Sequence, residues 1–126
     1  MVWKKRMDET ATLMSILAMK HFLADYVFNP LHTVPTNKHI YGSRGSLEHL
    51  GVHMFFCFFA LVPFTSLSLV MYAILFDGFV HYHEDFIKTT YLHKRKGLSE
   101  RFRRAITGMD QLVHILTYIV IVWWLT

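Results

Sequence analysis

Cysteine, proline and charged residues are scarce in this chain of 126 residues. Its one cysteine, Cys57, has no partner within the chain, which excludes an internal disulfide and favours a buried, inert thiol. The three prolines, Pro30, Pro35 and Pro63, fall between apolar stretches, where they would end helices. Charged residues make up 17% of the sequence and hydrophobic residues 53%, a balance too apolar for an ordinary small soluble domain.

The chain also lacks a long uninterrupted apolar run. Each apolar stretch alone is shorter than the about 20 residues that cross a bilayer, and approaches that length only when neighbouring ionisable turns are included. A soluble helical bundle would need polar faces repeated every three or four residues. The stretches 55–62 and 115–125 have no such face, and Trp123 and Trp124 suit a membrane interface. We therefore expect an all-α integral membrane protein.

A complete signal peptide pattern is missing as well. The start of the chain, residues 1–6, is basic and precedes an apolar run, as a signal peptide would. However, no small-residue cleavage site follows, and His21 and Asp25 close the run. We expect this segment to be a retained first helix.

The pattern predicts a single domain, 1–126, folded as an antiparallel four-helix bundle that spans the membrane. The loops 29–46 and 92–104 are polar and rich in turn residues. Four spanning helices would place both termini on one side of the membrane and both loops on the other. The expected helices cover about 8–28, 47–62, 67–91 and 105–124.

Basic residues are concentrated on the loop side. Lys38, Arg44 and the run 94–104 outweigh residues 4–6 at the side of the termini. By the positive-inside rule, the loops are expected to face the cytoplasm of a bacterial inner membrane. The run 101–104 is expected to bind anionic lipid headgroups and not nucleic acid. Self-association and contact with other membrane proteins stay open as partners.

Ionisable residues recur in pairs four residues apart, one pair in each predicted helix. This spacing places both side chains of a pair on one helix face. In the antiparallel order all the pairs lie toward the loop side, so we expect them to meet. The deeper layer then holds four imidazoles, and an outer layer about 6 Å away holds three carboxylates and one imidazole. The pairs are His21 and Asp25, His49 and His53, His81 and Asp85, and Asp110 and His114.

This set of side chains predicts a metal centre. Imidazole and carboxylate together suit zinc, iron or manganese, and unpaired polar groups at such depth would be costly. All eight residues are therefore predicted ligands, enough for two divalent ions. Alternatively, the four deeper histidines bind one ion, and Asp25, Asp85 and Asp110 orient them from behind. A proton or ion relay and a structural polar network are the remaining interpretations.

Other ionisable residues receive separate interpretations. Asp77 lies one turn deeper than His81 and is expected to support the centre. Lys88 is expected to pair with the carboxylate one turn before it, or to hold a phosphate at the interface. Lys20 is expected to extend toward the interface. His83 and His93 lie off the shared face and are expected to be interfacial.

The motifs also occur in a recognisable order. They are His21-Phe22-Leu23-Ala24-Asp25, His49-xxx-His53, His81-xxx-Asp85-xx-Lys88 and Met109-Asp110-Gln111-Leu112-Val113-His114. The ordered set, over about the whole chain, resembles the domain-of-unknown-function 3307 family of small bacterial and phage membrane proteins. The resemblance implies a four-helix membrane domain, and it brings no established activity. Asn29 stands where a Gln usually follows the first motif.

Two functional hypotheses follow from the predicted centre. The first is a membrane-embedded metal-dependent hydrolase acting on a lipid or lipid-linked substrate, with Asp25 or Asp110 as the catalytic base. The second is a non-enzymatic protein: a metal sensor, an ion carrier, or an assembly or phage immunity factor whose metal stabilises the bundle. The spacing of His49 and His53 is found in membrane desaturases, but their His-His motifs are missing.

Overall fold

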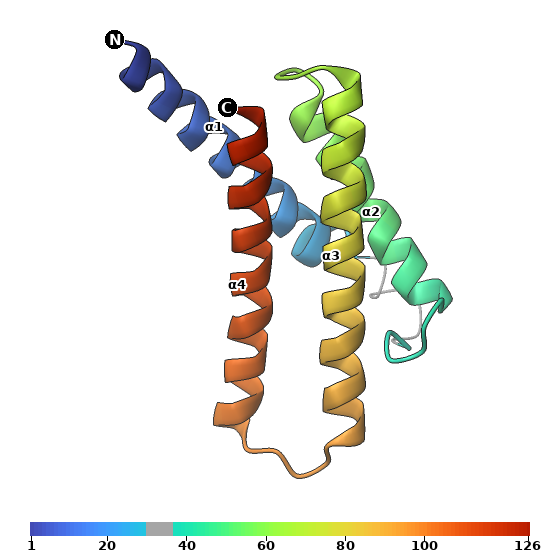
Figure 1. The fold of residues 1–126 in the computed structure, drawn as a ribbon. Coiled ribbons are helices and arrows are strands. Elements are labelled where there is room, and N and C mark those ends of the chain that lie inside the picture. Colours follow the sequence, from blue (N-terminus) through green and yellow to red (C-terminus); the bar gives the residue numbers. More distant parts are fainter. Residues whose placement is uncertain (30–36) are drawn as a thin grey trace.

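The computed structural model describes residues 1–29 and 37–126. Within these ranges the protein is all-α, with four long helices and no strand (Figure 1), which confirms the all-α, four-helix part of the predicted fold class. The helices are α1 (Val2–Phe22), which continues into the short π-helix η1 (Leu23–Val27), α2 (Arg44–Leu61), α3 (Leu67–Lys94) and α4 (Glu100–Leu125).

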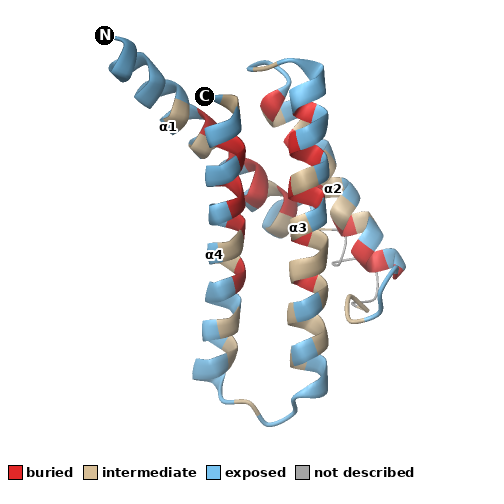
Figure 2. Ribbon diagram, viewed as in Figure 1, coloured by how far each residue is buried: buried red, intermediate tan, exposed pale blue. Residues whose placement is uncertain are grey.

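The helices pack as a ring around a shared interior. α1 contacts α2 and α4, and α3 contacts the same two helices. Figure 1 shows both termini at one end and the α3–α4 connection at the other. α1 crosses the bundle obliquely, and its exposed first residues project beyond it (Figures 1 and 2). Side chains from opposite helices can therefore meet in the middle of the ring.

α1, α2 and α4 begin earlier than the apolar pattern predicted. α1 starts at Val2, so the basic first residues are helical. α2 is capped by Ser43, whose Oγ accepts from the Ser46 N–H at 3.4 Å, and α4 by Ser99, whose Oγ accepts from the Phe102 N–H at 3.2 Å. In α2 and α4 the cap precedes the first apolar residues by about one turn, which hydropathy alone does not detect. Of the predicted loop 29–46, residues 30–36 lie outside the described residues.

The sequence predicts a first helix that continues to residue 28, but the end of this helix is not α-helical. Its last turn is η1, in which the Phe28 N–H donates to the Leu23 carbonyl five residues earlier at 2.8 Å. A π-turn is wider than an α-turn and is often found at functional sites. Here it contains Asp25, so the local geometry of one predicted site residue differs from that of a regular helix.

The buried residues face the interior of the bundle (Figure 2). Many of them are polar, while large apolar residues are exposed on the outside. Buried apolar packing centres on Leu17, Leu61 and Ile121. Outside, aromatic residues such as Phe55 and Phe79 are more than half exposed. Among the described helices, α4 is the one long and apolar enough to cross a membrane by length and composition. The buried polar residues are Lys20, His21, Ser43, Ser46, His49, His53, Asp77, His81, Asp85, Asp110, His114 and Thr117.

A glycine allows α2 and α3 to approach closely beside the polar interior. A Cβ atom added at Gly78 would lie 3.3 Å from Leu50 Cδ1 and 3.5 Å from Met54 Cγ, both on α2. Gly78 precedes His81 by one helical turn, and the His81 ring stacks on His53 of α2 with centroids 3.7 Å apart. The close contact of α2 and α3 therefore lies about one helical turn from two predicted ligands, His53 and His81.

Lys20 does not extend to an interface, and that expectation is wrong. Its side chain is 3% exposed and forms an ion pair with Asp77, which is 2% exposed. The Lys20 ammonium also lies 5.0 Å from the centroid of the Tyr118 ring. The lysine therefore lies inside the ring of helices, where Asp77 of α3 supplies the opposite charge.

We expect Lys20→Met and Asp77→Leu each to lower the free energy of unfolding by roughly 3–5 kcal/mol, because each leaves the partner charge buried and unpaired. The double variant should recover most of this loss, because it removes both charges. Unfolding of the purified protein in mixed micelles by increasing dodecyl sulfate measures the effect. Lys5→Met, which removes a lysine with an 82% exposed side chain, is the control. Single variants as stable as this control would contradict the prediction.

Candidate metal centre

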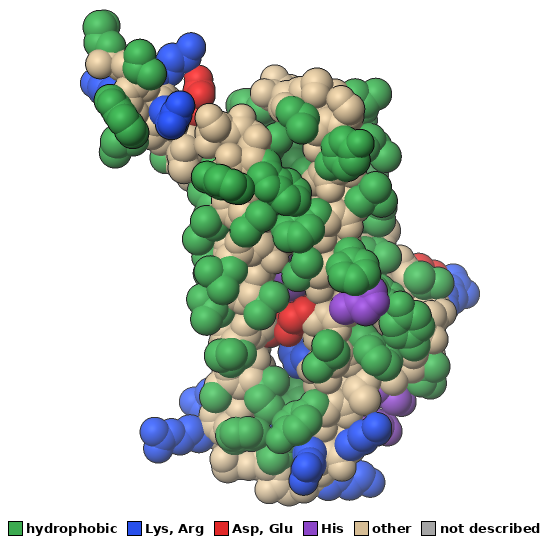
Figure 3. All heavy atoms as spheres, in the orientation of Figure 1, with side chains coloured by type: hydrophobic (Ala, Val, Ile, Leu, Met, Phe, Trp, Pro, Cys, Tyr) green, Lys and Arg blue, Asp and Glu red, His purple; other side chains and the backbone are tan. Residues whose placement is uncertain are grey.

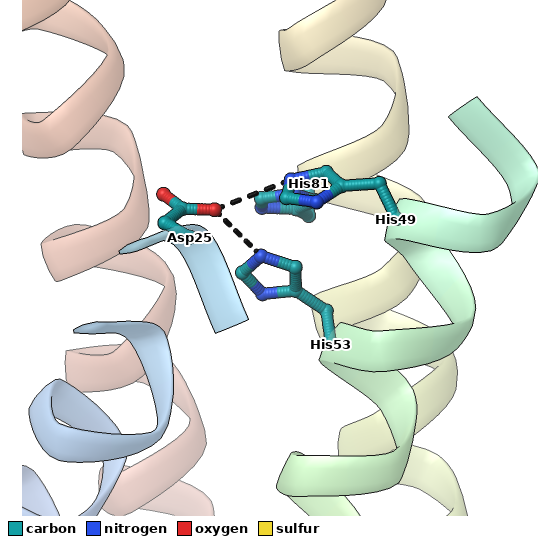
Figure 4. Close-up of side chains that lie close together, drawn as sticks. All are labelled: Asp25, His49, His53 and His81. Atoms are coloured by element: carbon teal, nitrogen blue, oxygen red, sulfur yellow. Dashed lines mark hydrogen bonds and ion pairs between the residues drawn. The ribbon is translucent and has the colours of Figure 1, made fainter. Parts of the chain in front are cut away.

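Asp25 gathers imidazoles from two helices. Its Oδ1 lies 2.8 Å from His53 Nε2 and 3.2 Å from His49 Nε2, both on α2 (Figure 4). Its Oδ2 lies 2.9 Å from Nε2 of His21, one turn earlier in the chain. The π-turn thus places one carboxylate among three imidazole nitrogens.

His81 lies at the centre of the histidine cluster. Its ring centroid lies 3.7 Å from that of His53, 4.6 Å from that of His114, 5.1 Å from that of His49 and 6.2 Å from that of His21. The predicted convergence of histidines from all four helices is therefore present. However, the layers are not distinct, because His49 of the expected outer layer lies against two imidazoles of the deeper one.

Two sets of ligand atoms in this cluster are spaced closely enough to surround an ion. Asp25, His49, His53 and His81 offer atoms within 4.8 Å of one another, and His21, His81 and His114 do the same. Two ligands of a tetrahedral zinc ion with bonds of about 2.0–2.1 Å lie roughly 3.4 Å apart. The 3.2 Å contact of Asp25 with His49 is close to that separation, whereas its 2.8 Å contact with His53 is a hydrogen bond. The donor set, mostly nitrogen with one carboxylate, suits zinc, iron or manganese.

Several buried ring nitrogens have no hydrogen-bond partner among the described residues. They include Nδ1 of His49, His53 and His114, and both nitrogens of His81. A neutral imidazole carries one donor and one acceptor, and leaving them unpaired in the interior costs free energy. The His81 side chain is only 3% exposed, so bulk water does not compensate it. Metal coordination would use the lone pairs of these nitrogens, so the residues present fit a bound metal ion.

His21 differs from the other histidines of the cluster because both of its nitrogens are paired. Nδ1 lies 2.9 Å from the Tyr118 hydroxyl, and Nε2 lies 3.2 Å from Gln111 Oε1 in addition to Asp25. Such partners fix the orientation of an imidazole. The predicted role of His21 as a ligand stays a prediction, and its contacts equally suit an orienting role.

The last predicted pair, Asp110 and His114, lies beside Glu84, a residue that the sequence pattern did not predict. His114 Nε2 lies 3.0 Å from Asp110 Oδ1 and 3.5 Å from Oε2 of Glu84 on α3. These three side chains form a further group with ligand atoms within 4.8 Å of one another. Glu84 follows His81 by three residues, and this i,i+3 spacing was the signal that could have identified it.

Asp85 occupies a different environment from the other predicted ligands. Its Oδ2 lies 2.5 Å from the Lys38 ammonium, and its Oδ1 lies 3.0 Å from the Lys88 ammonium. Lys88 also lies 2.8 Å from Asp110 Oδ2, so the expected pairing of Lys88 with Asp85 is present and extends to α4. Asp85 is not in any of the three groups with metal-ligand spacing among the described residues. Its predicted role as a ligand is not supported by this spacing.

A polar cavity of ≈ 200 Å³ opens beside the cluster. Its lining combines candidate ligands with two lysines, and it also includes Asn29, whose side chain donates to the Asp25 carbonyl at 3.0 Å. Figure 3 shows acidic and basic side chains in a hollow between α3 and α4, surrounded by hydrophobic ones. The lining residues are Asp25, Tyr26, Asn29, Lys38, His49, His81, Asp85, Lys88, Thr107, Asp110, Gln111 and His114.

The remaining histidines in the described ranges lie away from the centre. His83 contacts the Tyr41 hydroxyl at 3.1 Å and the Phe79 carbonyl at 2.8 Å. His39 and His93 stack on each other with ring centroids 3.8 Å apart. The pattern therefore separated His83 and His93 correctly from the residues of the shared face.

These observations define a class: a four-helix bundle whose interior holds histidine and carboxylate groups able to bind a metal ion. The chain belongs to the family described as "Protein of unknown function (DUF3307)", whose sequence model matches residues 13–126. The resemblance noted from the motifs is thereby confirmed. No match was found among the curated proteins or the solved structures.

We expect His81→Leu to abolish or strongly reduce metal binding. Without metal, the variant should be at least as stable as the wild type, because leucine removes two unpaired buried nitrogens. With metal at 100 times its dissociation constant, the wild type should gain about 2.7 kcal/mol and the variant much less. Elemental analysis and thermal unfolding with and without zinc measure both effects. His83→Leu is the matched control, and a His81→Leu variant with wild-type metal content would contradict the prediction.

Proposed function

We propose that this chain is an integral membrane protein whose centre binds a divalent transition metal and hydrolyses a phosphate ester on a lipid or lipid-linked substrate. The proposal has three parts: the membrane as environment, the metal as cofactor, and hydrolysis as chemistry. Each part is supported by a separate set of observations.

The distribution of polar and apolar side chains supports the membrane environment. Large apolar residues are exposed on all four helices, while ionisable residues concentrate inside. In a bilayer, ionisable side chains face the bundle interior and pair with one another, as Lys20 and Asp77 do. Contiguous exposed apolar surface is rare on soluble monomers. The basic loops would then face the cytoplasm and contact anionic headgroups.

The unpaired nitrogens and the spacing of the ligand atoms support the proposal that the centre binds a metal ion. The set of Asp25, His49, His53 and His81 offers three imidazoles and one carboxylate from η1, α2 and α3 (Figure 4). Zinc, iron and manganese are the candidate ions for such donors. A bound ion of this kind supplies an activated water and polarises a phosphoryl oxygen.

The cavity beside the ligands is the observation that carries the hydrolytic function. A metal that only stabilises a fold is usually enclosed by protein ligands, whereas a catalytic metal keeps an open position. Here His49, His81 and Asp25 all line a polar space of ≈ 200 Å³. Lys38 and Lys88 line the same space and could hold a phosphate group.

The reaction can be assigned to residues of this chain. Water adds through its oxygen to phosphorus, the ester P–O bond breaks, and the proton lost by water is balanced by one gained by the leaving alcohol. Asp25 and Asp110 both line the cavity, and either carboxylate could accept the water proton on an oxygen that does not bind the ion. Lys88 is placed to neutralise negative charge on the phosphate.

We expect purified protein loaded with Zn²⁺ or Mn²⁺ to release inorganic phosphate from micelles containing phosphatidic acid. Asp25→Asn should lower the rate by about 10²–10⁴-fold, because it removes a proton acceptor and a ligand charge. A malachite green assay for phosphate measures the rate. His83→Ala, which changes a histidine outside the centre, should retain the wild-type rate. Phosphate release that survives metal chelation, or that is unchanged in Asp25→Asn, would refute the hydrolytic assignment.

The non-enzymatic alternative is favoured by one observation, the complete burial of His53, which is 0% exposed. A metal held there would also stabilise the bundle. If this were its sole role, chelation would unfold the protein. A metal-free protein that stays folded and regains phosphate release when metal is returned would favour catalysis.

We expect the two ends of the bundle to face opposite sides of the membrane, with the basic loops inside. Lys96→Cys lies in the α3–α4 connection, and Ser66→Cys lies in the connection at the other end. A maleimide that cannot cross membranes should label Ser66→Cys in spheroplasts, and Lys96→Cys only after lysis. Buried Cys57 should stay unlabelled and serves as the internal control. Labelling of both variants in intact spheroplasts would contradict the membrane topology.

A further inference from the structure

Glu84 differs from its neighbours Asp85 and Asp110 because no lysine pairs with it among the described residues. Asp85 contacts Lys38 and Lys88, and Asp110 contacts Lys88. Glu84 Oε2 lies 3.5 Å from His114 Nε2 and has no hydrogen-bond partner in the described part of the chain. The Glu84 carboxyl group also contacts that of Asp110. Its side chain is 16% exposed.

Two carboxylates meet at this place. Oxygens of Glu84 and Asp110 lie within 4.8 Å of each other and of a His114 nitrogen. Like charges at such a distance in a buried setting repel unless a proton or a cation lies between them. Lys88 compensates Asp110 through Oδ2, which leaves Oδ1 facing His114. A cation beside Oδ1 would contact all three side chains.

This group is separate from the first set of ligands, which consists of Asp25, His49, His53 and His81. Glu84, Asp110 and His114 come from α3 and α4, and none of them belongs to the set around Asp25. The two sets are nevertheless neighbours, because the His81 and His114 rings have centroids 4.6 Å apart. Helical bundles with inward carboxylates and histidines can hold two ions side by side.

We infer that Glu84, Asp110 and His114 bind a second divalent cation, Mn²⁺ by the chemistry of the donors, next to the ion held by the first set. Two carboxylates and one imidazole form a harder donor set than three imidazoles and one carboxylate, and hard oxygen donors suit manganese. The inference rests on the proposed metal-binding function and adds a second ion and a ligand, Glu84. With two ions, the centre would clamp both the attacking and the leaving oxygen of a phosphate ester.

The test counts Mn²⁺ bound to purified protein in detergent micelles after equilibrium dialysis. We expect two ions per wild-type chain, one in Glu84→Gln and one in His53→Ala, because each variant disables a different site. Glu84→Asp, which keeps the carboxylate on a shorter side chain, should retain part of the second ion. Glu48→Gln on α2 is the matched control and should bind two. Glutamine preserves the size of the side chain, and thermal unfolding without metal verifies that each variant is folded.

The outcomes separate the inference from the proposed function. If Glu84→Gln binds as much Mn²⁺ as the wild type while His53→Ala loses metal, the second site is refuted and the first stands. If neither substitution changes the metal content, both are refuted. Electron paramagnetic resonance gives an independent readout, because two neighbouring Mn²⁺ ions couple their spins. That coupling should be present in the wild type and absent in Glu84→Gln.

Discussion

The contact of one carboxylate with imidazoles from two helices is the interaction on which the centre depends. Asp25 lies in the π-turn that ends the first helix and faces His21, His49 and His53. Without it, His49 and His53 of α2 would present further unpaired nitrogens to a largely closed interior, at a cost in free energy for each buried group. The π-turn therefore has a specific consequence: it brings a charge to the point where α1 and α2 meet.

In the rest of the interior, buried carboxylates are paired with lysines. Lys20 neutralises Asp77 in the depth of the bundle, and Lys38 and Lys88 neutralise Asp85 and Asp110 beside the cavity. Each pair joins two parts of the chain that are distant in sequence. Breaking a buried pair costs more than forming it gains, so such pairs fix which helix faces which. The arrangement is held together by polar contacts inside and by the apolar packing around Leu17 and Ile121.

Local spacing predicted the helices and most of the residues that meet, because a helix places residues four apart on one face. It could not predict which turn of a helix would widen, since the residues of η1 have no evident π-turn pattern. It also missed partners that depend on how helices cross. Lys20 pairs with Asp77 of a different helix, and Lys38 reaches Asp85 from a segment without periodicity. Glu84 was hidden for another reason: its spacing from His81 is three and not four.

The contact at Gly78 limits how the two stacked imidazoles can rearrange. At this residue the Leu50 and Met54 side chains of α2 lie against α3, and His53 and His81 project from the two helices about one turn further on. A Cβ atom at this position would lie 3.3 Å from Leu50 Cδ1, so that side chain would have to shift by a few tenths of an ångström. The geometry that these two imidazoles would offer to an ion is thereby linked to a residue that carries no donor atom.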